Sequence, residues 1–392
     1  MNTDSMKFSK RFDGVSGSAI REIFKLLGKP GMISFAGGNP AASALPDLEV
    51  AEISREVLLR DGKTLLQYGA TEGYKPFLES LSPYVKERFS IDAQPSDILP
   101  TTGSTQAMNL LCSALIDPGD AIVVENPTFL GNMQCMRLYQ ANLIPVQSDE
   151  NGMDTDELEE KIKQYHPKMI YIIPTFQNPT GRTLSLERRK RVAELSEKYG
   201  VVVAEDDPYH DLRYAGNALP TIKSFDQAGW VAFMGSFSKV ISPGLRVGYL
   251  IAEPRLLRKC VVAKQSGDLH TGLLNQAICD AYLRKGLLAP HVEQICLSYA
   301  RQLDTMLQCL AASDAFASYT RPEGGLFVFA ALKEGKNALE LLKKAVELGV
   351  AYVPGTHFYA DGGHENTLRL NFSNAGEAAI RRGMELLDQA LI

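Results

Sequence analysis

The chain has 392 residues, of which 45% are hydrophobic and 22% are charged, so it has enough apolar material for two or three structural domains. Its net charge of −5 argues against nucleic acid or an anionic membrane as a partner. The sequence has no apolar run long enough to cross a bilayer, and its N-terminus has no hydrophobic signal core. We therefore expect a soluble, cytoplasmic protein.

Six cysteines are scattered along the chain without a Cys-x-x-Cys pair. In a chain of this length, that spacing predicts reduced, partly buried thiols rather than a disulfide framework. The six are Cys112, Cys135, Cys260, Cys279, Cys296 and Cys309.

The first predicted elements are a short helix over residues 17–28, which contains Arg21, and an apolar strand that begins at Met32. The strand runs into the glycine pair Gly37 and Gly38. Such a pair can be a simple turn, or it can let the backbone approach a ligand closely.

The next candidate is the turn Gly103-Ser104-Thr105. Apolar residues between Ala107 and Leu115 recur at helical spacing, so this turn lies at a helix N-terminus. Free backbone N–H groups and the helix dipole favour an anion at that position. The alternative is that Ser104 or Thr105 simply caps the helix.

Five apolar segments in the middle of the chain are predicted strands, at residues 120–125, 169–173, 201–204, 230–234 and 246–252. They alternate with helical segments, which predicts an α/β fold with a doubly wound, largely parallel sheet. Such sheets place their sites at the carboxyl ends of the strands. The side chains that follow these ends are therefore candidates: Phe129, Asn178, Asp206 and Tyr209.

Two charged clusters in this region could suggest a nucleic-acid site and a metal site, but the surrounding residues favour neither. The basic run Arg188–Arg191 could bind nucleic acid, but it lies in a segment with helical spacing that stops at Gly200, which predicts a solvated helix face. The three carboxylates Glu205–Asp207 would suit a metal, but no matching histidine spacing accompanies them. We therefore expect no metal site.

The segment Gly235–Tyr249 concentrates polar chemistry after a buried strand. Ser236, Ser238 and Lys239 follow the strand, and Arg246 follows a Pro-Gly turn. Hydroxyls, turn glycines and an arginine supply the donors of a phosphate site. The lysine could be a point charge on that phosphate or a nucleophile toward a carbonyl held beside it. The Walker pattern, which would favour the point charge, is absent.

The C-terminal part changes character. It has predicted strands at residues 325–329, 350–353 and 367–372, with a helix over 338–348 between the first two. In the last strand, alternation places Arg369 opposite the apolar residues. From the residues alone, Arg369 would be ordinary polar surface.

The sequence Ser-Phe-Ser-Lys-x-x-x-Pro-Gly-Leu-Arg-x-Gly around Lys239 resembles the cofactor-lysine segment of class I and II pyridoxal-phosphate-dependent aminotransferases. The resemblance extends from Ala19 to Phe372, with the motifs in family order. It is closest to the 2-aminoadipate, kynurenine and aromatic aminotransferases, which are similar in Ser-Phe-Ala-Gly-Gly, Leu-Gln-Tyr, Glu-Asp-Asp and Gly-Glu-Asn-Thr-Leu-Arg-Leu.

The resemblance implies the aspartate aminotransferase-like fold of pyridoxal-phosphate-dependent transferases. Its large, doubly wound, cofactor-binding domain would span residues 46–290. Its smaller α+β domain would combine residues 1–45 and 291–392. It also implies a homodimer with active sites at the interface.

The implied cofactor is pyridoxal 5′-phosphate, bound as a Schiff base on Lys239. Asp206 would pair with the pyridinium nitrogen, and Tyr209 and Asn178 would hydrogen-bond the ring oxygen. Phe129 would stack on the ring, where many relatives have tyrosine or tryptophan. The groups implied for the cofactor phosphate are Ser104, Thr105, Ser236, Ser238, Arg246 and Tyr68 of the partner subunit.

The implied activity transfers an amino group between an L-amino acid of the glutamate, 2-aminoadipate or aromatic type and a 2-oxo acid such as 2-oxoglutarate, with ping-pong kinetics. Arg369 and Asn178 would hold the substrate α-carboxylate, with Gly38 beside the substrate. Arg21 would recognise a distal carboxylate, or it is a solvent-facing helix residue. Asn39 is polar where leucine is more usual in the subgroup.

Three other classes compete with this interpretation. A pyridoxal-phosphate-dependent C–S or β-lyase would share the fold and every cofactor contact. A non-enzymatic effector module of a transcription regulator would need a DNA-binding domain, for which the roughly forty residues before the glycine pair are too few. A nicotinamide oxidoreductase would need Gly-x-Gly-x-x-Gly after a strand, which the sequence lacks.

Overall fold

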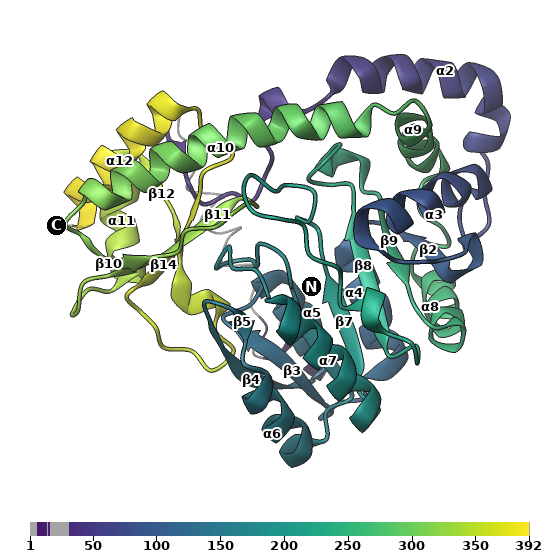
Figure 1. Ribbon diagram of the computed structural model, residues 1–392, viewed down its shortest axis with the longest axis horizontal. Coiled ribbons are helices and arrows are strands. Elements are labelled where there is room, and N and C mark those ends of the chain that lie inside the picture. The colour runs from purple at the N-terminus through teal and green to yellow at the C-terminus, as the bar shows by residue number, and fades with distance from the viewer. Residues whose placement is uncertain (1–5, 14, 16–30, 392) are drawn as a thin grey trace.

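The computed structural model describes residues 6–13, 15 and 31–391 (Figure 1). Its largest sheet has eight strands in the order β2-β9-β8-β7-β6-β3-β4-β5. Neighbouring strands from β8 through β7, β6 and β3 to β4 are parallel, and β9 runs antiparallel to both β8 and β2. The predicted doubly wound, largely parallel sheet is therefore confirmed. Its strands are β2 (Ile98–Thr101), β3 (Ala121–Asn126), β4 (Asn142–Asp149), β5 (Gly152–Met153), β6 (Met169–Ile172), β7 (Val202–Asp206), β8 (Val231–Ser236) and β9 (Gly248–Ile251).

Helices cover both faces of this sheet, because its central strands have apolar side chains on both sides. Val124 of β3 belongs to the larger core, which also contains Met108 of α4 and Met133 of α5. Its neighbour Val123 belongs to a second core, which contains Leu158 of α6 and other residues of α6 and α7. The α-helices are α2 (Asp47–Leu65), α3 (Lys75–Phe89), α4 (Ser104–Leu115), α5 (Leu130–Leu138), α6 (Thr155–Tyr165), α7 (Leu186–Tyr199), α8 (Pro254–Gly267), α9 (Leu273–Arg284), α10 (Leu288–Ala312), α11 (Ala338–Leu348) and α12 (Glu377–Leu391).

A second, four-stranded antiparallel sheet is built from the C-terminal part, in the order β10-β11-β14-β13. Helices α10, α11 and α12 lie beside it, and α10 extends from there toward the helices of the large sheet (Figure 1). The strands are β10 (Phe316–Tyr319), β11 (Phe327–Leu332), β13 (Val353–Pro354) and β14 (Thr367–Asn371).

The N-terminal segment joins this C-terminal part, since β1 (Ile33–Ser34) pairs in parallel with β12 (Val350–Ala351). The domain limits at residues 45/46 and 290/291 remain a prediction. The first falls just before α2 and the second inside the first turn of α10. Short 3-10 helices complete the described chain: η1 (Lys10–Phe12), η2 (Ala42–Ala44), η3 (Pro95–Asp97), η4 (Lys223–Phe225), η5 (Pro243–Leu245) and η6 (Gly355–Phe358).

The prediction of a solvated helix face at Arg188–Arg191 is wrong for one residue. Arg189 is 0% exposed, and its guanidinium donates to the carbonyl oxygens of Pro174 (2.7 Å) and Leu184 (2.9 Å). The reason is helical phase: Arg189 shares its face with Val192, so it points toward the sheet while its neighbours point outward. As expected, Gly200 ends the helix in the left-handed conformation.

All six cysteines are free, and four of them are buried, as the sequence predicts. In the part of the chain that the structure describes, no helix is both long and apolar enough to cross a membrane. Among the same residues, no group of three or more His, Cys, Asp or Glu side chains is arranged to hold a metal ion.

Candidate active site

All the predicted site residues except Tyr68 and Arg21 line one cavity of about 260 Å³ at the carboxyl edge of the large sheet. The register explains why. Asp206 pairs with Met234 at the end of β7, and Ser236 ends β8 opposite Gly248. The cavity is lined by Gly38, Asn39, Ser104, Thr105, Phe129, Ile173, Asn178, Asp206, Pro208, Tyr209, Ser236, Ser238, Lys239, Pro243, Arg246 and Arg369.

Lys239 supplies an amine to this cavity. Its Nζ donates a hydrogen bond to the carbonyl oxygen of Gly38 at 2.7 Å, which shows the glycine pair to be in contact with the site. Burial, together with the positive charges of Arg369 and Arg246, lowers the pKa of Lys239 to about 8. A substantial share of the amine is therefore neutral near pH 8 and can act as a nucleophile or a base.

Asp206 supplies a carboxylate in which only one of the two oxygens has hydrogen-bond partners among the described residues. Its Oδ2 accepts hydrogen bonds from the Tyr171 hydroxyl (2.9 Å) and from Asn132 Nδ2 (3.1 Å). Its Oδ1 is buried and has no partner within the described residues. Burial raises the pKa of Asp206 to about 7, against the lowering effect of the Tyr171 hydrogen bond. A cationic group at Oδ1 would therefore restore the ionised carboxylate.

Tyr171 and Asn132 are functional residues that the sequence analysis did not identify. Tyr171 stands inside the apolar strand Met-Ile-Tyr-Ile-Ile and is completely buried. A buried hydroxyl needs a partner, so a tyrosine in such a strand was a usable signal for a polar group behind the site. Asn132 offered no comparable signal, because it lies one turn into an ordinary helix.

The turn before α4 forms one side of the cavity. Gly103, with φ of 79°, occupies the N-cap, and no side chain in the described chain caps this helix. The capping alternative for Ser104 and Thr105 is therefore wrong, and the first backbone N–H groups of α4 remain available to an anion. Arg246 Nη2 donates to the carbonyl oxygen of Thr102 at 3.0 Å, beside this turn. A Cβ on Gly103 would lie only 2.4 Å from that nitrogen.

Arg369 provides another cation of the cavity and is buried, so the expectation of ordinary polar surface is wrong. Its Nη1 donates to Asn178 Oδ1 at 2.8 Å, and its guanidinium lies over the rings of Phe327 (4.1 Å) and Phe358 (5.1 Å). Burial lowers the pKa of Arg369 to about 10, so it stays cationic at neutral pH. Its Nε has no partner among the described residues. Asn178 Nδ2 also donates to the Tyr209 hydroxyl at 3.5 Å, which joins the predicted ring-oxygen ligands to the substrate side.

Comparison with known proteins decides the family. The model of aminotransferase class I and II matches residues 30–387. The chain belongs to this family. It is 41% identical to aromatic-amino-acid aminotransferase 1 of Thermococcus litoralis, over 98% of this chain and 94% of the relative. It is 40% identical to the 2-aminoadipate transaminase of Thermus thermophilus, over 99% of this chain and 97% of the relative.

The structure of the multiple substrate aminotransferase from Thermococcus profundus superposes with a TM-score of 0.93 at 38% identity, over 98% of this chain and 97% of that one. This likeness confirms the predicted aspartate aminotransferase-like fold. The chain is thus an aminotransferase, and its cofactor is pyridoxal 5′-phosphate.

The residues of the cavity fit this cofactor. The unpartnered Asp206 Oδ1 suits a protonated pyridine nitrogen, and the uncapped start of α4 beside Arg246 suits a phosphate. Phe129, at the N-cap of α5, offers a ring for stacking, and a Cβ on Gly131 would lie 2.6 Å from that ring.

One predicted residue, Tyr68, lies away from this cavity, and another, Arg21, is not described. Tyr68 follows α2, is 81% exposed, and packs its ring edge against His270 with centroids 6.2 Å apart. It does not line the cavity of its own chain. Arg21, with the predicted helix over 17–28, lies outside the described residues.

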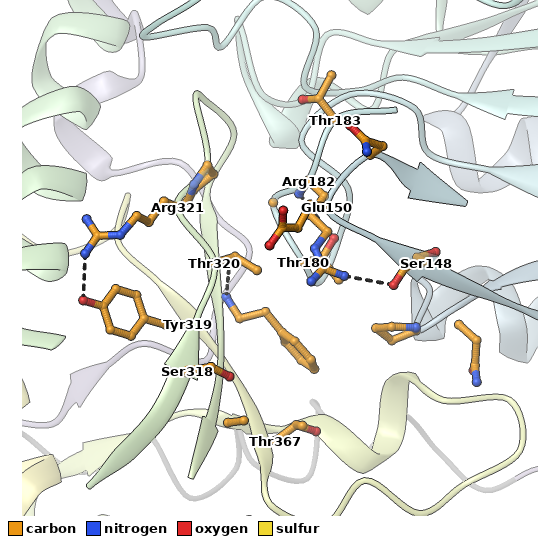
Figure 2. A pocket seen from close by; sticks show the side chains of 18 of the residues that line it. Ser148, Glu150, Thr180, Arg182, Thr183, Ser318, Tyr319, Thr320, Arg321 and Thr367 are labelled. Carbon is orange, nitrogen blue, oxygen red and sulfur yellow. Dashed lines mark hydrogen bonds between the residues drawn. The ribbon is translucent and has the colours of Figure 1, made fainter. Parts of the chain in front are cut away.

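A larger cavity, of about 840 Å³, lies apart from the cavity that contains Lys239 (Figure 2). It lies between the loop that carries Thr180 and Arg182 and the strands β10 and β11, and Arg182 donates there to the Ser148 carbonyl at 3.1 Å. None of the described residues predicted for the site lines it. Size alone would therefore have selected the wrong cavity.

Proposed function

We propose that this aminotransferase moves an amino group between an L-amino acid of the glutamate, 2-aminoadipate or aromatic type and a 2-oxo acid such as 2-oxoglutarate, by a ping-pong route through Lys239. One observation carries the proposal. A single cavity holds the Lys239 amine with its lowered pKa, the half-satisfied Asp206 carboxylate and the buried Arg369 guanidinium. The names of the relatives from Thermococcus litoralis and Thermus thermophilus support the substrate classes.

When bound, pyridoxal phosphate supplies a carbonyl for an amine and an electron-accepting ring that stabilises negative charge on the substrate α-carbon. The residues of the chain have distinct tasks around it. Asp206 would keep a proton on the ring nitrogen, and Tyr209 and Asn178 would hydrogen-bond the ring oxygen. Phe129 would stack on the ring. Lys239 Nζ would be the nucleophile toward the carbonyl and, as a free amine, the base that takes the proton from the substrate α-carbon.

The substrate carboxylate belongs at Arg369, whose planar fork matches a planar anion. Asn178 helps to orient that guanidinium through the 2.8 Å hydrogen bond. Gly38 leaves room for backbone to approach the substrate, and Asn39 adds a polar residue to the cavity wall. We assign recognition of a distal carboxylate to Arg21, which Arg21→Ala tests by a selective loss of acidic substrates.

The phosphate belongs with the α4 N-terminus (Ser104 and Thr105), the hydroxyls of Ser236 and Ser238, and Arg246. We infer that Tyr68 completes this group in a homodimer, by reaching the site of the partner subunit. Its high exposure supports the inference, as do the exposed apolar side chains of Leu48, Leu59 and Leu66 on and after α2 and of Val262 and Leu269 on and after α8. The six free thiols support a cytoplasmic location.

A half-reaction experiment tests the proposal. Single amino acids are added to the purified, reconstituted protein while the cofactor absorbance is followed. Glutamate, 2-aminoadipate or an aromatic amino acid should convert the bound cofactor to its amine form, and 2-oxoglutarate should reverse the change. Lys239→Ala should abolish turnover, while Lys168→Ala, at the opposite edge of the same sheet, should not.

Two results would contradict the proposal. If no cofactor chromophore appears after reconstitution, Lys239 is not a cofactor lysine. If pyruvate and ammonia are released from cysteine-type substrates without any 2-oxo acid, the protein is a lyase.

A further inference from the structure

A completely buried lysine lies behind the phosphate side of the cavity and is not among the residues that line it. Lys264 of α8 has a side chain that is 0% exposed. Its Nζ contacts Gln106 Oε1 (2.7 Å), Asp268 Oδ1 (2.9 Å) and Thr271 Oγ1 (3.0 Å). A buried ammonium is costly unless it is fully paired, so this one is held in a fixed geometry.

The partners of Lys264 all reach Thr102, the residue that leads into the phosphate turn. The backbone N–H of Thr102 donates to Gln106 Oε1 at 2.7 Å, the same oxygen that accepts from Lys264. The Thr102 hydroxyl donates to Asp268 Oδ2 at 2.9 Å. The Thr102 carbonyl accepts from Arg246 Nη2 at 3.0 Å. The N–H and the hydroxyl of Thr102 therefore hydrogen-bond to groups that also bind Lys264, and its carbonyl hydrogen-bonds to Arg246.

The same cluster also borders Tyr68. Thr271, which accepts from Lys264, uses its carbonyl to contact His270 Nδ1 at 3.0 Å, and the His270 ring packs edge-on against Tyr68. In one chain, the α4 turn, Arg246 and Tyr68 therefore all adjoin the Lys264–Asp268 pair, in which the lysine is buried and the carboxylate side chain is 31% exposed. The α4 turn and Arg246 belong to the chain's own cavity, whereas Tyr68 is assigned to the cavity of the partner subunit.

Burial and pairing act in opposite directions on the pKa of each member of the pair. Burial lowers the pKa of Lys264, and Asp268 opposes that effect. Burial raises the pKa of Asp268, but hydrogen bonds from Lys264 and its neighbours outweigh this, and the pKa ends below its usual value.

We propose that Lys264 is a positioning residue for the cofactor phosphate: paired with Asp268, it fixes the Thr102–Thr105 turn and, through the Thr102 carbonyl, the direction of Arg246. This inference rests on the proposed function, since it assumes the phosphate at the α4 N-terminus. A purely structural lysine would only hold α8 against α4. Its loss would then weaken all ligands of the cavity alike.

The test compares ligands with and without a phosphate group on the apoprotein. Pyridoxal phosphate and pyridoxal are titrated by absorbance, and inorganic phosphate is used as a competitor. In Lys264→Met, we expect the Kd of pyridoxal phosphate to rise at least about tenfold, which corresponds to about 1.4 kcal/mol. The Kd of pyridoxal should change less than about threefold, and inorganic phosphate should compete more weakly.

Two further variants make the result decisive. Thr102→Val removes the hydroxyl link but leaves the Lys264–Asp268 pair, so it should show the same selective loss even if Lys264→Met fails to fold. Lys168→Met removes a lysine that pairs with Asp120 at 2.7 Å at the far edge of the same sheet, and it should bind all three ligands like wild type.

Equal weakening of pyridoxal and pyridoxal phosphate, or unchanged binding in both the Lys264 and the Thr102 variants, would overturn the inference. Failure of the wild-type apoprotein to bind pyridoxal phosphate would instead contradict the proposed function.

Discussion

Replacing Tyr171 by phenylalanine removes one hydroxyl from behind Asp206 and keeps the shape of the buried side chain. That hydroxyl donates to Asp206 Oδ2 at 2.9 Å, and Asn132 is the other donor to the same oxygen. A hydrogen bond to a charged group contributes about 1.5–3 kcal/mol. Since about 1.4 kcal/mol corresponds to one pKa unit, the pKa of Asp206 should rise by about one to two units in Tyr171→Phe.

The expected consequence is weaker cofactor binding near neutral pH. The pKa of Asp206 is already about 7 because of burial, so the carboxylate of the variant would be largely protonated at pH 7.5. A protonated Asp206 cannot pair with a pyridinium cation. The affinity for pyridoxal phosphate should therefore fall roughly threefold to thirtyfold at pH 7.5, and the acid limb of the affinity profile should move upward by about one to two pH units.

The stability of the apoprotein provides a second measurement with a definite sign. The pKa of Asp206 in the folded chain lies above its value of 3.8 in the absence of the fold. Its contribution to stability is therefore greatest below pH 4 and is lost as the pH rises through 7. In Tyr171→Phe, the decrease in stability that accompanies ionisation of Asp206 should continue to higher pH. Thermal unfolding of the apoprotein across the pH range measures this decrease.

The control is Tyr352→Phe, which removes another buried hydroxyl, one that donates to the Ala338 carbonyl in the C-terminal part. It should shift neither the acid limb of cofactor affinity nor the pH dependence of unfolding in this range. If Tyr171→Phe binds pyridoxal phosphate with the same pH profile as wild type, the hydroxyl does not hold Asp206 ionised.

Three further predictions concern other parts of the molecule. Gly103→Ala forces a side chain into a conformation (φ 79°, ψ 166°) that is nearly reserved for glycine, so it should cost about 1–3 kcal/mol in thermal unfolding and weaken phosphate binding. Arg189→Met leaves buried carbonyls unpaired and should cost about 2–4 kcal/mol, whereas Lys190→Met on the outer face should stay within about 0.5 kcal/mol. Arg369→Lys loses the bidentate fork and should raise KM for amino acids at least about tenfold, while Arg382→Lys on α12 serves as a control with unchanged KM.

Much of the site could be predicted because its signals are local. A strand that ends in polar residues, and a glycine turn that opens an amphipathic helix, place their groups at one sheet edge whatever the rest of the chain does. The residues that could not be predicted depend on distant partners. Arg189 is buried because carbonyls of residues 174, 184 and 220 converge on it. Strand β2 pairs with β9, some 150 residues later in the chain, and no periodicity in either segment indicates this pairing.

Arg369 is another residue whose burial depends on distant partners that the sequence pattern does not indicate. Alternation along its strand correctly separates it from the apolar face, but the pattern says nothing about what covers the other face. Here the other face meets Phe327, Phe358 and Asn178, so the arginine is enclosed and has two polar partners. Only the resemblance to a family indicated that this face is a substrate site.

The charges of the cavity also depend on one another. Arg369 and Arg246 both help to lower the pKa of Lys239. They are also the two residues to which we assign the binding of anions. Binding of a phosphate at Arg246 and a carboxylate at Arg369 would neutralise them, so the pKa of Lys239 should rise as the site fills. Because the phosphate and the carbonyl belong to one cofactor molecule, Lys239 would meet that carbonyl with Arg246 already neutralised and only Arg369 still lowering its pKa. Once the substrate carboxylate also occupies Arg369, the amine would bind a proton more readily, which suits its role as the base toward the substrate α-carbon.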